Sequence, residues 1–128
     1  MTYIVDTHVF AWLLDKNKRL SQKYKEILLN DKHTFIISAI VLAEIKHLIS
    51  VKRININFET VIEYLSECDN CIVYPVNEDV VEHMPVGLDI HDGIIVATGL
   101  IYKNFQGDNV FILTEDETIR NSGILPVA

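Results

Sequence analysis

The sequence predicts an α/β protein, a three-layer α/β/α sandwich around a short parallel sheet. Four short apolar runs recur along the chain without the polar–apolar alternation of a half-exposed strand, and longer helical patterns separate them. The chain has 128 residues, of which 49% are hydrophobic and 23% charged, the balance of one ordinary globular domain. We therefore expect residues 1–128 to form a single domain whose sheet is covered on both faces.

The first half of the chain supplies two of the expected strands, at residues 3–5 and 34–37. Helical patterns fill residues 9–14, 22–30, 39–50 and 58–67. Ser21 and Ser38 are suitable N-caps for the second and third of these helices. In the fourth helix Val61, Ile62 and Leu65 are expected to face the core.

The second half is expected to hold strands at 71–74 and 110–113 and helices at 78–84, 93–102 and 116–121. Pro75 ends the first of these strands because it has no backbone N–H to donate. The helix at 93–102 is apolar almost all round, so it must be buried on most sides. Asp92 is expected to open it.

The charge balance limits the possible partners. Lys and Arg number 11 and Asp and Glu 18, so the net charge is 11 − 18 = −7. A surface this acidic opposes nucleic acid, unless several acids are gathered around divalent cations. The richest apolar stretch, residues 35–43, is interrupted by Ser38 and is far shorter than the roughly 18 to 20 residues of a membrane helix. The N-terminus does not resemble a signal peptide. With only two cysteines, we expect a cytoplasmic protein that contacts no membrane.

Two acids lie where a parallel sheet places its ligands, at the carboxyl ends of strands. Asp6 directly follows the first strand, and Asp116 closely follows the last. Each is also a suitable N-cap for the next helix, so a purely capping role is the alternative. The neighbouring Thr7 and Thr114 carry hydroxyls that can position a water or a phosphate, or simply stabilise a turn.

Two further acids lie on helices. Glu44 follows Val41 by three residues and precedes Leu48 by four, so its carboxylate lies beside the apolar stripe, where it needs a compensating partner. The alternatives for Glu44 are a Lys or Arg partner or a position at the edge of the stripe, and the alternative for Asp92 is an N-cap role. Four carboxylates at one sheet edge would repel one another unless cations held them, and an oxygen-only ligand set favours Mg²⁺ or Mn²⁺. Such a site suits phosphodiester hydrolysis.

Four segments resemble the motifs of the PIN-domain family: IVDT at 4–7, SAIVLAEI at 38–45, HDGIIVAT at 91–98 and LTED at 113–116. They occur in the family's order over nearly the whole chain, and the length is most similar to that of the VapC-type toxins of toxin–antitoxin pairs. The resemblance implies an α/β/α fold and a Mg²⁺- or Mn²⁺-dependent endoribonuclease that acts on RNA. It also implies a homodimer inhibited by a cognate antitoxin. The catalytic and metal-binding acids it implies are Asp6, Glu44, Asp92 and Asp116.

The match has departures. Gly93 stands where family members often have Arg or Ala. Asp89 and Glu115 are extra acids beside the third and fourth positions. We favour Asp92 over Asp89 because the apolar helix is expected to begin directly after it. We favour Asp116 over Glu115 because Asp116 follows Thr114 at the spacing of the family's motif.

Other signals receive ordinary structural interpretations. Cys68 and Cys71 have CxxC spacing but follow a helix instead of opening one, so we interpret them as two half-buried thiols. His8 and His91 adjoin site acids and are interpreted as partly exposed side chains; contact with a carboxylate or the substrate is the alternative.

Aromatic and basic residues offer possible RNA contacts. Phe10 and Trp12 are expected in the core or at a dimer contact, with base stacking as the alternative. Two basic clusters are candidate phosphate contacts or solvated helix faces. They comprise Lys16, Lys18, Arg19, Lys23 and Lys25, and Lys46, Lys52 and Arg53.

Three other function classes compete with the ribonuclease. A phosphoacceptor receiver domain would need a pair of acids after the first strand, where this chain has only Asp6. An inactive binding module of the same fold would have lost a site acid, and all four are present. A DNA-directed or structure-specific nuclease stays open, because the acids do not report the sugar.

Overall fold

A four-stranded parallel sheet forms the centre of the computed structural model, which describes residues 1–128. Its strand order is β3-β2-β1-β4. Ile4 of β1 pairs with Ile36 on one side and Ile112 on the other, and all three side chains are fully buried. The strands are β1 (Thr2–Val5), β2 (Thr34–Ser38), β3 (Cys71–Tyr74) and β4 (Val110–Leu113).

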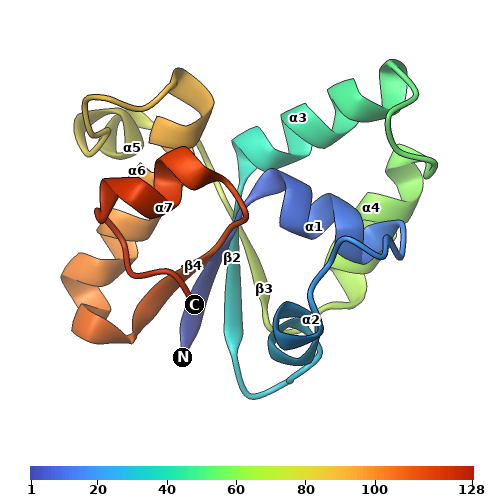
Figure 1. Ribbon diagram of the computed structural model, residues 1–128, viewed down its shortest axis with the longest axis horizontal. Coiled ribbons are helices and arrows are strands. Elements are labelled where there is room, and N and C mark those ends of the chain that lie inside the picture. The colour runs from blue at the N-terminus through green and yellow to red at the C-terminus, as the bar shows by residue number, and fades with distance from the viewer.

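Helices cover both faces of the sheet, so the predicted three-layer sandwich is confirmed (Figure 1). Four helices lie to the right of the sheet in that view: α1 (Thr7–Leu14), α2 (Gln22–Leu28), α3 (Ala39–Ser50) and α4 (Phe58–Glu67). Three lie to the left: α5 (Glu78–Glu82), α6 (Ile90–Gln106) and α7 (Glu117–Ser122). A short 3-10 turn, η1 (Gly107–Asn109), leads into β4. None of the helices is long and apolar enough to cross a membrane.

The strand order reverses between β1 and β4. The chain builds outward from β1 to β2 and β3, then returns and adds β4 on the other side of β1. The backbone N–H of Asp6 donates to the carbonyl of Leu113 at 3.0 Å, so the two strand ends lie side by side. In open α/β sheets such a switch point, at the carboxyl ends of the strands, is where ligands bind.

Helix α6 lies close against the sheet because of one glycine. A Cβ on Gly99 would collide with the side chain of Leu125 and lie 3.0 Å from Cγ1 of Ile4. Seven consecutive residues of α6, from 93 to 99, are buried, as its apolar sequence predicts. This packing fixes the first turn of α6 next to the end of β1.

The structure corrects the predicted start of this helix. Helix α6 begins at Ile90, not after Asp92, and its N-cap is Asp89, whose Oδ1 accepts from the backbone N–H of Asp92 at 2.8 Å. The apolar pattern hid this start because the first turn contains the polar pair His91 and Asp92. The capping role expected as the alternative for Asp92 therefore belongs to Asp89.

Two smaller expectations are also wrong. The helical pattern places Ile62 in the core, but its side chain is 48% exposed, because α4 buries only a narrow face around Val61. Cys68 and Cys71, interpreted from their position after a helix as two half-buried thiols, form a disulfide. Cys68 leaves α4 in an extended conformation, and the turn that follows brings the two Cα atoms within 5.5 Å, a separation a disulfide can span.

Candidate functional site

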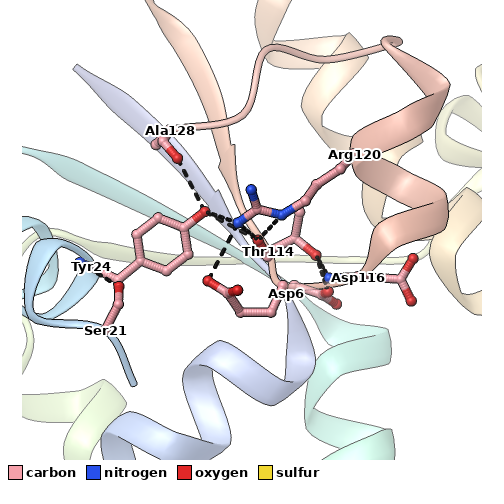
Figure 2. A network of polar contacts seen from close by, with 8 residues as sticks. Asp6, Ser21, Tyr24, Thr114, Asp116, Arg120 and Ala128 are labelled. Carbon is pink, nitrogen blue, oxygen red and sulfur yellow. Dashed lines mark hydrogen bonds and ion pairs between the residues drawn. The ribbon is translucent and has the colours of Figure 1, made fainter. Parts of the chain in front are cut away.

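Asp6 is the most buried acid of the site. It is 6% exposed and caps α1, its Oδ1 accepting from the backbone N–H of Thr7 at 2.8 Å. Its Oδ2 accepts from the hydroxyl of Thr114 at 2.6 Å (Figure 2). Burial raises the pKa of Asp6, and these two hydrogen bonds oppose the rise by favouring the charged form. Capping and membership of an acidic site are thus compatible in one residue.

Asp116 repeats this arrangement at the end of β4. Its Oδ1 caps α7 by accepting from Ile119 N–H at 2.9 Å, while its own backbone N–H donates to the Thr114 hydroxyl at 3.0 Å. Its second carboxylate oxygen makes no hydrogen bond within the protein. The hydroxyl of Thr114 therefore links the two predicted acids Asp6 and Asp116 across the switch point, a role in positioning carboxylates.

A further network fixes the carbonyl of Thr114. Arg120 donates to it from Nη2 at 2.7 Å and from Nε at 3.1 Å. The Tyr24 hydroxyl lies 3.1 Å from the same carbonyl and 3.1 Å from that of Ala128, and it accepts from Arg120 Nη2 at 3.2 Å (Figure 2). Sequence reasoning missed Arg120 and Tyr24. Tyr24 lies far from Thr114 in the chain, and no local pattern marks either residue.

Glu44 has polar partners on two sides. Its Oε1 accepts from the Thr7 hydroxyl at 2.8 Å, and its Oε2 lies 3.4 Å from Nδ1 of His91. Its side chain is 26% exposed. The Lys or Arg partner considered as one alternative is absent, because the polar contacts come from a threonine and a histidine. His91 therefore makes the carboxylate contact that the sequence analysis gave as the alternative for His8 and His91.

The pKa of Asp92 responds to the negative charges of the other acids. Its pKa is raised from 3.8 to about 7, first by burial and then by the negative charges of four other acids. These acids are Asp116, Asp89, Asp6 and Glu44. The fold therefore brings the four predicted site acids into one electrostatic neighbourhood, which we call the carboxylate cluster: Asp6, Glu44, Asp92 and Asp116. Glu115 instead pairs with Arg120 at 3.3 Å.

The donor chemistry of the carboxylate cluster fits a hard divalent cation. As the side chains stand, no three His, Cys, Asp or Glu residues form a group that could hold one ion between them. Mg²⁺ does not require such a cage, because it keeps several waters and binds proteins through one or two carboxylates. The free oxygen of Asp116 suits that mode, and a divalent cation would favour the ionised form of Asp92, whose pKa is raised by burial and by the neighbouring acids.

A larger pocket than the one beside the carboxylate cluster lies elsewhere on the protein. It has a volume of about 540 Å³, is lined by residues such as Trp12, Leu20 and Tyr64, and contains no carboxylate. A pocket of about 390 Å³ adjoins the carboxylate cluster and includes Thr7 and Glu44 in its wall. The candidate site is therefore identified by its carboxylates and not by the volume of its pocket.

Comparisons with known proteins agree with this geometry. The PIN domain family matches residues 3–121 of the chain. No curated protein matches the sequence. Among solved structures, the chain is similar to one described as VapBC2 from Rickettsia felis bound to a DNA fragment from their promoter. The similarity covers 100% of this chain and 98% of that one, with a TM-score of 0.65 and 16% sequence identity.

Proposed function

Because the chain belongs to the PIN domain family, we propose that it is a divalent-cation-dependent endoribonuclease and the toxin of a toxin–antitoxin pair. The observation that carries the proposal is that the Thr114 hydroxyl donates to Asp6 and accepts from the N–H of Asp116, so two acids are held together at the switch point. The pKa of Asp92, raised to about 7 first by burial and then by the neighbouring acids, supports it. Carboxylates gathered at one sheet edge supply the oxygen ligands that Mg²⁺ and Mn²⁺ prefer, and a divalent cation would offset their mutual repulsion.

The residues of the cluster have distinct parts in this mechanism. Asp6, Glu44, Asp92 and Asp116 would hold the cation, directly or through water, and a bound cation would supply a more acidic water and positive charge opposite the phosphate. Asp6 and Asp116 are held by the Thr114 hydroxyl, and Glu44 by the hydroxyl of Thr7. Glu44 or Asp92 would share in orienting the attacking water; in Glu44 it is Oε2, with only the 3.4 Å contact to His91, that could do so.

The proposed partners follow from the family and from the solved relative. That structure is described as a VapBC2 complex on promoter DNA, and its similarity spans this whole chain. We propose that this protein likewise has a cognate antitoxin, acts as a homodimer and works in the cytoplasm. Production of the protein alone should then arrest growth, and co-production of the antitoxin should relieve the arrest.

Cleavage of a labelled single-stranded RNA tests the activity. Wild-type protein with Mg²⁺ or Mn²⁺ should cut it, and EDTA should stop the reaction. Asp6→Asn keeps a capping oxygen but loses the charge, so its rate should fall by orders of magnitude. Glu115→Gln is the matched control, because Glu115 faces Arg120 outside the cluster.

The same assay separates the alternatives. Preferential cutting of a DNA strand of the same sequence would indicate a DNA-directed nuclease. RNA binding without cleavage at any metal concentration would indicate an inactive binding module.

A further inference from the structure

The pocket beside the carboxylate cluster is lined by three histidines from three different helices. His8 comes from α1, His47 from α3 and His91 from α6, and the pocket has a volume of about 390 Å³. Ile40 and Leu48 supply apolar wall, and Glu44 is shared with the cluster. We call this the histidine pocket. Its volume is that of a small-ligand site, and its mixture of flat polar rings and aliphatic side chains suits a planar heterocycle.

A second, smaller pocket adjoins the histidine pocket. It has a volume of about 110 Å³ and shares His8 and Leu48 with it. Its other lining residues include Arg19, Arg53 and Trp12, and the rings of His8 and Trp12 lie 6.1 Å apart. We call it the arginine pocket. The two pockets therefore adjoin each other beside α1 and α3, and the histidine pocket meets the carboxylate cluster at Glu44.

The two arginines have no acidic partner. The salt bridges of the protein are His91–Glu44 and Arg120–Glu115, and neither involves Arg19 or Arg53. Of the 11 Lys and Arg residues only Arg120 forms a salt bridge, so what distinguishes Arg19 and Arg53 is that both line one pocket. A guanidinium group binds a phosphate through two parallel hydrogen bonds, so a phosphate is the partner it fits best.

The carboxylate cluster, the histidine pocket and the arginine pocket adjoin one another in that order. They suit, in turn, a phosphate, a base and the next phosphate of a single RNA strand. We infer that the RNA strand leaves the carboxylate cluster along α1 and α3, placing a base in the histidine pocket and the next phosphate against Arg19 and Arg53. The inference rests on the proposed function, since the scissile phosphate must lie at the cluster. Unpaired bases stack on flat side chains and are splayed from their neighbours in this way, whereas the bases of a duplex are already paired and stacked. The histidines act here as flat surfaces and hydrogen-bonding groups, whatever their charge.

Binding by a protein that cannot cleave provides the first test. In the Asp6→Asn background with Mg²⁺, a short fluorescent single-stranded RNA is titrated and its anisotropy followed. Arg19→Gln with Arg53→Gln should raise the Kd by about tenfold or more. The slope of log Kd against log salt should fall by about 0.7 for each phosphate that the variant no longer neutralises. The control pair Lys32→Gln with Lys103→Gln removes the same charge at the opposite end of the sheet, and should change Kd less than twofold.

Kinetics of the active protein provide the second test. His47 touches no residue of the carboxylate cluster in the hydrogen-bond network, so His47→Ala should raise KM several-fold and leave kcat unchanged. His83→Ala, outside both pockets, is its control. Thermal melts confirm that each variant is folded.

The outcomes separate the two proposals. If wild type cleaves RNA but the arginine pair behaves like the lysine pair, the inferred course of the RNA strand is wrong and the proposed function stands. If His47→Ala lowers kcat without raising KM, the base does not occupy the histidine pocket. If wild type neither binds nor cleaves RNA, both proposals fail together.

Discussion

The hydroxyl of Thr114 donates a hydrogen bond of 2.6 Å to Oδ2 of Asp6, joining residues 108 positions apart in the chain. The bond spans the boundary between β1 and β4, where the strand order reverses. It is a charge-assisted hydrogen bond to a buried carboxylate, which belongs to the stronger class of hydrogen bonds in proteins. The two strand ends that supply Asp6 and Asp116 are thereby held in one arrangement.

Thr114→Val should damage both stability and activity. Valine preserves the shape but leaves Oδ2 of Asp6 buried without a donor, and it removes the acceptor of the Asp116 N–H. We expect a loss of about 2 kcal/mol in the free energy of unfolding. A supporting hydrogen bond beside metal ligands typically contributes about 10- to 100-fold in activity, so cleavage should fall within that range. Thr114→Ser keeps the hydroxyl, and urea melts and cleavage rates of this control should stay close to wild type.

Tyr24→Phe tests the network behind Thr114. The change removes one hydroxyl that contacts the Thr114 carbonyl, while both Arg120 contacts to that carbonyl remain. The expected loss is therefore small, about 1 kcal/mol of unfolding free energy, with RNA cleavage reduced less than by Thr114→Val. A Tyr24→Phe protein as inactive as Thr114→Val would show that Arg120 alone does not hold this loop.

The stability of the metal-free protein should fall as pH rises from about 4 to about 7. Below pH 3.8 Asp92 is protonated in both the folded and the unfolded chain, so it contributes no difference. Between 3.8 and about 7 the unfolded chain releases this proton while the folded protein retains it, which favours unfolding. The raised pKa of Asp6 acts in the same direction.

Asp92→Asn removes this penalty, so in EDTA at pH 7.5 it should melt a few degrees higher than wild type. Millimolar Mn²⁺ should stabilise wild type by binding only the folded state, and should stabilise Asp92→Asn less. Thermal melts across pH, with EDTA and with Mn²⁺, measure both effects. Equal Tm values and equal metal responses in the two proteins would place Asp92 outside the cluster.

Most of the fold could be predicted from the sequence because its strands are short, wholly apolar and separated by helical patterns. The strands at 71–74 and 110–113 and helix α4 have the predicted bounds. The start of α6 could not be predicted from apolar periodicity, because a cap is decided by one side-chain oxygen, here that of Asp89. The disulfide of Cys68 was missed for a similar reason: it depends on how one turn folds back.

The positions of the candidate acids at the strand ends could be predicted from the sequence, but the residues that surround them could not. Asp6 and Asp116 are visible in the sequence because strand ends are visible. Their assignment to a metal site stays a prediction. Arg120 and Tyr24 reach Thr114 only through tertiary packing, and the histidine pocket requires three helices to meet. Such relationships depend on the fold as a whole and leave no local pattern.

The most direct test of the carboxylate cluster compares Asp92→Asn with Asp89→Asn. The two acids lie three residues apart at the start of the same helix, and asparagine can still cap it in place of Asp89. The rate of single-stranded RNA cleavage is measured at saturating Mn²⁺ for both variants and wild type. We predict a fall of several orders of magnitude for Asp92→Asn and a rate within a few-fold of wild type for Asp89→Asn. Equal rates for the two variants, or the reverse order, would contradict a nuclease site built on Asp92.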